Sequence, residues 1–200
     1  MEEKKSVLVE VREWLIIILI AILFAVLLDS QVLSVMKIQY NSMEHTLLED
    51  QKIVVEKLSY KFSEPKAGDI VIFHTETKSD SFLDDIYITV SGMVARLKGV
   101  EKYERYVKRV IGVQGDVIDI REGSVYVNGV KLEEPYVHAP TEEGILAYPV
   151  TVGENEYFVM GDNREVSIDS REFGMVEDKQ LVGKAVFRLY PFNKIGMIKP

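Results

Sequence analysis

Residues 106–120 read YVKRVIGVQGDVIDI, and our prediction of the fold begins with this stretch. Two apolar segments rich in β-branched residues, 106–113 and 117–120, stand on either side of Gly115-Asp116, a pair typical of a turn. We interpret the two segments as strands. Short runs of the same kind recur, so the sequence predicts a mainly β fold whose other strands include 53–55, 70–73, 86–90, 157–160 and 181–190.

The clearest local signal is a hairpin at 124–132, SVYVNGVKL. Asn128-Gly129 supplies the two positive φ angles of a type I′ turn, which joins two antiparallel strands. Two further segments, at about 74–104 and 121–155, hold the stretches richest in polar residues, Pro and Gly, and we interpret them as excursions from the β core. The sequence shows no internal repeat, and beyond its N-terminal segment it shows no long amphipathic helix.

The N-terminal segment carries a membrane signal. Residues 14–28, WLIIILIAILFAVLL, would extend about 22 Å as a helix at about 1.5 Å per residue, against about 30 Å of bilayer hydrocarbon. We expect the span to borrow flanking residues, Arg12 on one side and Val32 and Leu33 on the other. A buried core helix would need a large surrounding core, and no small-x-small cleavage site follows. The sequence therefore predicts an uncleaved anchor at 14–33.

The distribution of positive charge predicts which way the anchor is oriented. Three cations precede the span and one lies close behind it, namely Lys4, Lys5, Arg12 and Lys37. Cations are retained on the cytoplasmic side. We therefore expect a cytoplasmic leader at 1–13 and an extracytoplasmic domain at 34–200, held at the cell membrane.

Composition excludes several classes of function. The net charge of −8 argues against a nucleic-acid-binding protein, which needs a basic face to neutralise phosphates. The absence of cysteine rules out disulfides and a thiolate nucleophile. His45, His74 and His138 stand at no ligand spacing, so we expect neither a metal nor a cofactor. Peptides are the expected partners.

A candidate nucleophile lies in the segment 39–47, QYNSMEHTL, just beyond the anchor. Serines at such positions usually form turns or caps, and Ser42 would need a base within hydrogen-bond reach to attack a substrate. Lys108 is flanked on both sides by apolar residues, and burial would lower its pKa from about 10.4. An exposed lysine on an alternating strand fits the same pattern, so the residues alone leave both interpretations open.

Five blocks, in this order, resemble the bacterial type I signal peptidases. They are the apolar anchor, SMEHTL at 42–47, KAGDIVIF at 66–73, YVKRVIGVQGD at 106–116 and GDNREVSIDSREFG at 161–174, and the last two are the most specific. The resemblance covers nearly the whole chain. It implies an antiparallel, barrel-like β domain that acts as a membrane-anchored serine endopeptidase, removes signal peptides from exported precursor proteins and uses no cofactor.

The resemblance also implies roles for individual residues. Ser42 would be the nucleophile, with its main-chain amide in the oxyanion hole, Lys108 the general base and Ser167 the residue that orients Lys108. A structural network would comprise Arg109, Asp162, Asp169 and Arg171, with Arg109 paired to Asp162. Shallow pockets for small substrate side chains would be lined by Met36, Ile38, Met43, Leu47, Ile53, Tyr106 and Val107. Precursor proteins and the lipid bilayer would be the partners, and we expect a monomer.

The sequence departs from the family pattern at three positions. His45 and Gln114 stand where proline is usual, and we expect looser turns there. Tyr40 stands where a small residue is common, so it cannot supply a serine hydroxyl to an oxyanion hole and would narrow the small-residue pocket. Exposed aromatic residues could rest on lipid, with Phe62, Phe82 and Phe192 as candidates.

Three alternatives stay open at this point. An inactive or dedicated relative of the family could serve in the assembly of surface fibres, although such a relative would be expected to lack the dyad. A self-cleaving Ser/Lys repressor shares the chemistry but would carry a basic DNA-binding domain. A membrane-tethered β-barrel could bind partners without catalysis, because a sequence cannot show that Ser42 and Lys108 meet.

Overall fold

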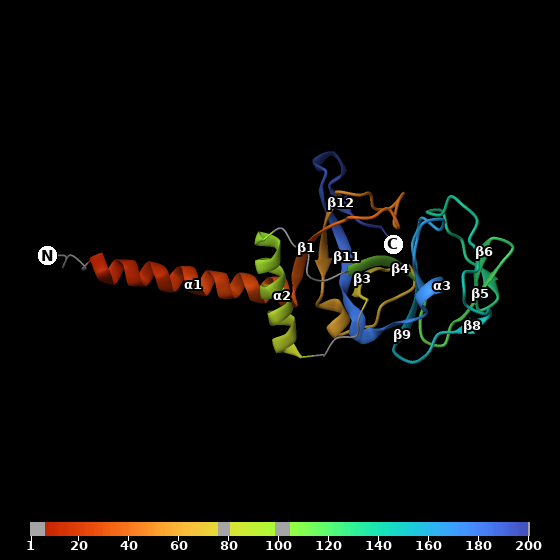
Figure 1. Ribbon diagram of the computed structural model, residues 1–200, viewed down its shortest axis with the longest axis horizontal. Helices are drawn as coiled ribbons and strands as arrows, with labels where there is room; N and C mark the ends of the chain where they lie inside the picture. Colours follow the sequence, from red (N-terminus) through yellow and green to blue (C-terminus); the bar gives the residue numbers. More distant parts are fainter. Residues whose placement is uncertain (1–6, 76–80, 99–104, 200) are drawn as a thin grey trace.

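A long helix, α1 (Val7–Gln31), projects from a domain built of antiparallel strands, as Figure 1 shows. The structure is a computed structural model that describes residues 7–75, 81–98 and 105–199. Of the described residues, α1 is the one helix long and apolar enough to cross a membrane, and none of its most apolar stretch is buried. Lys4 and Lys5 of the predicted leader lie outside the described residues.

The bounds of α1 correct our expectation of which residues lengthen the apolar span 14–28. The helix begins at Val7, so it is already helical ahead of Trp14, and its 25 residues extend about 37 Å at about 1.5 Å per residue. It ends at Gln31. Leu33, which we expected to prolong the anchor, is instead the first residue of a strand and pairs with Glu56.

The larger sheet follows the strand order β1-β2-β11-β3-β4-β9-β10, and β12 pairs with β11. All of its paired strands are antiparallel. The prediction of a mainly β, antiparallel fold is therefore confirmed. Its strands are β1 (Leu33–Lys37), β2 (Lys52–Glu56), β3 (Ile70–His74), β4 (Arg105–Gly112), β9 (Glu156–Met160), β10 (Val176–Glu177), β11 (Leu181–Tyr190) and β12 (Gly196–Met197).

A smaller sheet has the order β7-β6-β5-β8 and is also antiparallel. Its strands are β5 (Val117–Arg121), β6 (Ser124–Val127), β7 (Val130–Lys131) and β8 (Val150–Thr151). Asn128 and Gly129 have φ angles of 54° and 78°, as the predicted type I′ turn requires. The segment 121–155 thus contributes β6, β7 and β8 to the smaller sheet, in which they join β5. The buried residues of this sheet pack against Phe158 of β9.

The predicted strand at 86–90 is wrong, and so is the expectation of no long helix after the anchor. Residues 86–90 lie inside α2 (Phe82–Leu97), which connects β3 to β4. The run IYITV is rich in β-branched residues, which favour strands, but this preference is weak and tertiary contacts override it. The neighbouring parts of the predicted excursion, 76–80 and 99–104, lie outside the described residues. The remaining short helices are η1 (Ser59–Lys61), α3 (Ser170–Phe173), η2 (Asp178–Gln180) and η3 (Phe192–Lys194).

The junction between α1 and the domain is fixed by polar contacts. Lys57 Nζ donates to the main-chain oxygens of Asp29, at 2.7 Å, and Ser30, at 3.3 Å. Lys61 Nζ donates to the side-chain oxygen of Gln31. A cation at a helix C-terminus satisfies carbonyl groups that have no partner within the helix. Burial lowers the pKa of Lys57 to about 8, despite the opposing charge of Asp29.

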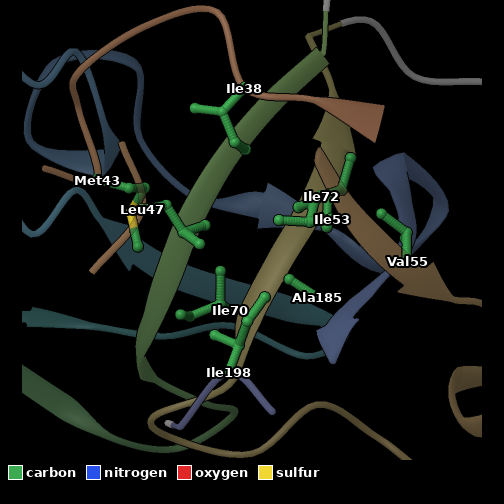
Figure 2. Close-up of a cluster of buried hydrophobic side chains, with 9 residues drawn as sticks. All are labelled: Ile38, Met43, Leu47, Ile53, Val55, Ile70, Ile72, Ala185 and Ile198. Atoms are coloured by element: carbon green, nitrogen blue, oxygen red, sulfur yellow. The ribbon is translucent and has the colours of Figure 1, made fainter. Parts of the chain in front are cut away.

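One of the apolar clusters lies beneath the loop that carries Ser42 (Figure 2). It joins residues of β2, β3 and β11 to the loop that follows β1 and to the end of the chain. Met43 and Leu47 project from the loop into this cluster, and both are almost completely buried. The members of the cluster are Ile38, Met43, Leu47, Ile53, Val55, Ile70, Ile72, Ala185 and Ile198.

We predict that Leu47→Ala lowers the free energy of unfolding by about 2–5 kcal/mol, because it leaves a cavity in a packed core. Chemical denaturation of the full chain in detergent would measure the change. Val130→Ala is the matched control, since Val130 is exposed at the tip of the β6–β7 hairpin and should change stability by less than about 0.5 kcal/mol. Equal effects of the two substitutions would contradict the assigned core.

Candidate active site

Ser42 and Lys108 lie within hydrogen-bond distance of each other. Lys108 Nζ on β4 donates to Ser42 Oγ over 2.8 Å, although the two residues are far apart in the sequence. The lysine side chain is buried, at 3% exposure of the residue. Burial lowers the pKa of Lys108 to about 8; the negative charge of Asp169 opposes this shift and the positive charge of Arg171 adds to it. Of the two interpretations of Lys108, the structure supports the buried amine.

The loop that carries Ser42 is held from both sides. Asn163 donates its main-chain N–H to the Ser42 carbonyl oxygen at 3.0 Å, and Leu47 N–H closes a turn onto the Met43 carbonyl oxygen at 2.7 Å. A Cβ on Gly161 would overlap both the Ser42 carbonyl oxygen and Ser167 Oγ. Position 161 therefore has room only for glycine, and this lets the closing block pack directly against the serine loop.

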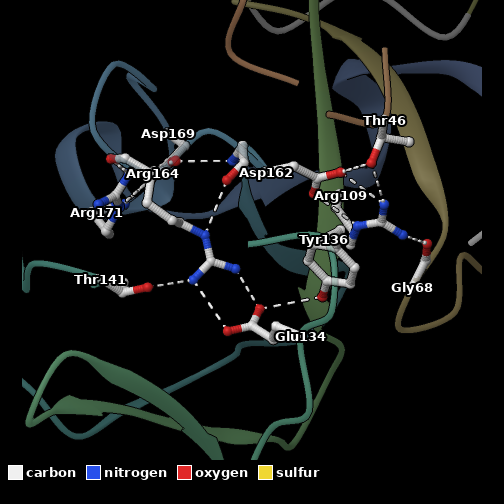
Figure 3. Close-up of polar contacts among 11 residues, drawn as sticks. Thr46, Gly68, Arg109, Glu134, Tyr136, Thr141, Asp162, Arg164, Asp169 and Arg171 are labelled. Carbon is white, nitrogen blue, oxygen red and sulfur yellow. Dashed lines mark hydrogen bonds and ion pairs between the residues drawn. The ribbon is translucent and has the colours of Figure 1, made fainter. Parts of the chain in front are cut away.

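The predicted pair of Arg109 and Asp162 is present and buried, as Figure 3 shows. Arg109 donates from Nε and NH2 to the two carboxylate oxygens, each over 2.8 Å. A third bond runs from Arg109 to the Gly68 carbonyl oxygen at 3.1 Å, and Thr46 donates its hydroxyl to Asp162. Burial alone would lower the pKa of Arg109, but its bonds to Asp162 outweigh burial and the pKa is raised. The pair links β4, the closing block and the serine loop.

A second buried pair joins Asp169 and Arg171, both of which the resemblance assigned to the structural network. Arg171 donates to the two carboxylate oxygens over 2.8 and 2.9 Å. Asp169 also accepts the Gly161 main-chain N–H at 2.9 Å. Because Arg171 and Gly161 already occupy the Asp169 carboxylate, this group influences Lys108 as a distant charge and forms no ion pair with it.

Sequence reasoning missed a third buried pair, formed by Arg164 and Glu134 (Figure 3). Arg164 also donates to the Gly161 carbonyl oxygen at 3.0 Å and to the Thr141 hydroxyl at 2.5 Å. Arg164 lies inside the quoted block GDNREVSIDSREFG, which was a usable signal. Glu134 and Thr141 come from the segment that we interpreted as an excursion, and nothing local in that segment marks them.

The expected contact between Ser167 and Lys108 is not formed. Ser167 is nearly buried and its Oγ has no hydrogen-bond partner among the described residues. The amine of Lys108 is directed to Ser42 instead. Ser167 Oγ and the Ser42 carbonyl oxygen nevertheless both lie close to Gly161, in the space that a side chain at position 161 would fill.

A groove of about 850 Å³ opens beside Ser42 and Lys108. Five of the seven predicted substrate-binding residues line it, namely Met36, Ile38, Met43, Tyr106 and Val107. Leu47 and Ile53 do not line it, because both are completely buried in the cluster beneath the loop. Other lining residues came from no prediction and include Val35, Gln39, Gly92, Val166 and Ile168.

The three departures from the family pattern fall in different places. Tyr40 lines the groove and is 60% exposed. His45 has a φ angle of 83°, which a proline ring cannot adopt, so the backbone here follows a path that excludes the usual residue. Its ring lies 3.8 Å from that of His138, centroid to centroid. Gln114 lines a separate cavity of about 600 Å³ that does not include Ser42 or Lys108.

Comparison with known proteins places the chain in a family. Residues 11–190 match the family described as "Signal peptidase, peptidase S26". Probable signal peptidase I-2 of Synechocystis sp. is 33% identical over 180 residues, which are 89% of this chain and 72% of that protein. Signal peptidase IB of Staphylococcus aureus is 30% identical over 201 residues, 92% of each chain.

A crystal structure of a signal peptidase I from Enterococcus faecalis is 27% identical and covers 61% of this chain and 97% of that one, with a TM-score of 0.40. Assignment to the family rests on the sequence, since the match takes in nine-tenths of the chain and contains both members of the Ser42–Lys108 contact. The chain belongs to the signal peptidase family, peptidase S26.

Proposed function

We propose that Ser42 and Lys108 are the catalytic dyad with which this signal peptidase removes N-terminal signal peptides from exported precursor proteins. The observation that carries the proposal is the 2.8 Å hydrogen bond between Lys108 Nζ and Ser42 Oγ. A serine hydroxyl needs a base at this distance to become a nucleophile. The presence of this contact disfavours an inactive relative of the family.

The dyad would act in two steps. In the first step Ser42 Oγ attacks the scissile carbonyl carbon while neutral Lys108 takes the hydroxyl proton, and the resulting ammonium then protonates the leaving amine. The product is an ester between Ser42 and the signal peptide. In the second step Lys108 takes a proton from water, which attacks the ester carbonyl carbon; the ammonium returns this proton to Ser42 Oγ as the ester bond breaks, and the signal peptide leaves with a new carboxyl group. The Ser42 main-chain amide would donate to the oxyanion in both steps.

Neutral Lys108 is available because burial is the dominant influence on its pKa. The negative charge that opposes this shift, that of Asp169, is held by Arg171. We assign Arg109, Asp162, Asp169 and Arg171 to support of the loop and strand that carry the dyad. Ser167 would orient the Lys108 amine once Ser42 is acylated, a role supported by its buried hydroxyl, which has no hydrogen-bond partner within the described part of the chain.

The groove would hold the substrate segment just before the cut. Its apolar lining by Met36, Ile38, Met43, Tyr106 and Val107 suits small side chains one and three residues ahead of the scissile bond. The exposed ring of Tyr40 would narrow this space. Preference for small residues at those two substrate positions is therefore the expected specificity.

We further propose that α1 anchors the enzyme in the cell membrane, with residues 1–13 in the cytoplasm and 34–200 outside, as a monomer. Support comes from the exposed apolar surface of α1 and from the cations at its N-terminal side. Such an anchor would hold the groove near the surface from which precursors emerge.

We predict that Ser42→Ala and Lys108→Ala each lower the rate of precursor cleavage by at least about a thousandfold, because the nucleophile or its base is removed. Gel analysis of a precursor whose signal ends in Ala-x-Ala would measure the loss. Ser63→Ala and Lys66→Ala are the matched controls outside the groove and should retain the full rate. Turnover close to that of the unsubstituted chain in either dyad variant would exclude the dyad.

The pH dependence of kcat/KM follows from the lowered pKa of Lys108. The base acts when deprotonated, so the rate should rise with pH, pass its half-maximum near pH 8 and then level off. Ser167→Asp should move the rising limb to higher pH, since a nearby anion favours the charged amine. A limb near the value of free lysine, about 10.4, would contradict the buried base.

The proposed orientation predicts what a protease can reach. Protease added to intact cells without a wall should digest the domain from residue 34 onward and should spare the first dozen residues. An epitope at each end of the chain would report the outcome on immunoblots. Protection of the domain with loss of the N-terminal epitope would reverse the assignment.

A further inference from the structure

Helix α2 exposes an apolar stripe along its length. Residues that recur at intervals of four and three lie on one face of an α-helix. In α2 the five residues at this spacing are all apolar and between 42% and 88% exposed, and they are Leu83, Tyr87, Val90, Val94 and Leu97. A stripe of this kind normally faces a core, so its exposure calls for an apolar medium outside the domain.

The opposite face of α2 is turned toward the protein. Thr89 and Gly92 are buried there, and Gly92 lines the groove beside Ser42. Asp85, one turn before Thr89 on the same face, accepts a hydrogen bond from Gln31 over 3.3 Å. Small and polar residues thus lie on the inward face and the five stripe residues on the outward face, which is the reverse of a helix packed on a water-soluble domain.

The position of α2 indicates what covers the stripe. In Figure 1, α2 lies across the C-terminal end of α1, with the β domain on one side and the length of α1 on the other. Gln31, which bonds to α2, is the last residue of α1 and follows the apolar run that ends at Leu28. Helix α2 is therefore fixed at the level where α1 would leave the hydrocarbon layer of the bilayer.

We propose that α2 is an interfacial helix that lies in the plane of the bilayer, with its apolar stripe buried at the boundary between lipid headgroups and acyl chains. Its 16 residues would extend about 24 Å at about 1.5 Å per residue, too short to span about 30 Å of hydrocarbon but long enough to lie on the surface. The proposal rests on the membrane anchoring proposed for α1 and not on the catalytic roles of Ser42 and Lys108.

This arrangement orients the enzyme as well as tethering it. A single helix can tilt and rotate in the bilayer together with the domain joined to it, whereas a second contact at α2 fixes one side of the domain against lipid. Gly92 lines the groove, so the fixed side is the one next to the groove. The groove would then face a precursor whose cleavage site lies at the same depth.

Lipid contact at single positions tests the proposal, and the chain suits this test because it contains no cysteine. The full chain would carry Val94→Cys labelled with an environment-sensitive fluorophore, in phosphatidylcholine vesicles. We expect blue-shifted emission, insensitive to added salt, that is quenched by nitroxides on the lipid acyl chains. Val130→Cys, exposed on the far hairpin, should give aqueous emission without quenching, and Ile18→Cys in α1 should be quenched.

The three labels separate the possible failures. Quenching at Ile18 without quenching at Val94 would overturn the interfacial helix and leave the anchoring of α1 intact. Absence of quenching at both positions would overturn the anchoring and the interfacial helix together. Blue-shifted emission from the label at position 94 in native membranes, but aqueous emission in phosphatidylcholine vesicles, would assign the stripe to a protein partner and overturn the lipid proposal.

A functional variant gives a second test. Leu83→Glu combined with Val94→Glu should slow cleavage of a vesicle-embedded precursor by about tenfold, because two apolar contacts with lipid are lost. Cleavage of a short soluble peptide should be unchanged, since neither residue lines the groove. Val130→Glu is the matched control and should affect neither substrate. Equal losses on both substrates would overturn an orienting role for α2.

Discussion

A buried amine can act as a base only where no neighbouring carboxylate holds its proton, and Lys108 meets this condition inside a site crowded with charge. Three arginines of this part of the domain are also buried, and each is paired with a carboxylate: Arg109 with Asp162, Arg164 with Glu134 and Arg171 with Asp169. Lys108 has a serine hydroxyl instead. Burial disfavours the charged form of all these groups, but at Arg109 and Arg171 the bonds to Asp162 and Asp169 outweigh it and the pKa is raised, whereas the pKa of Lys108 falls to about 8.

The arginine pairs also explain how a loop, two strands and a closing block can be held to the accuracy that a hydrogen bond requires. Asp169, the carboxylate whose charge acts on Lys108, is held by Arg171. Asp162 joins β4 to the serine loop through Arg109 and Thr46, and Asp169 holds Gly161 against the Ser42 carbonyl oxygen. Below the loop, Met43 and Leu47 supply the apolar contacts. Polar pairs above and a packed core below fix Ser42 from both directions.

Local pattern predicted most strands and the hairpin because alternation and Asn128-Gly129 are properties of neighbouring residues. It failed at α2, because the β-branched run 86–90 favours a strand and we gave it more weight than the helical spacing of the apolar residues from Leu83 to Leu97. The motifs identified Ser42, Lys108 and the pair of Arg109 with Asp162. They could not show that Leu47 and Ile53 belong to the core, that Glu134 reaches Arg164, or that Ser167 forms no hydrogen bond with Lys108, because each depends on tertiary distance.

The apolar helix α1 and the β domain are joined directly, with one residue between the end of α1 and the start of β1. Lys57 and Lys61 bond to the last residues of α1, and β1 begins almost immediately after the helix ends. Ser42 then follows β1 by one short loop whose apolar residues are fixed in the core. Since the connection from α1 to the nucleophile is short and held by these contacts, the depth of α1 in a bilayer would set the height of the groove directly. Contact of α2 with lipid would set the orientation of the groove, because α2 bonds to the end of α1 and Gly92 lines the groove.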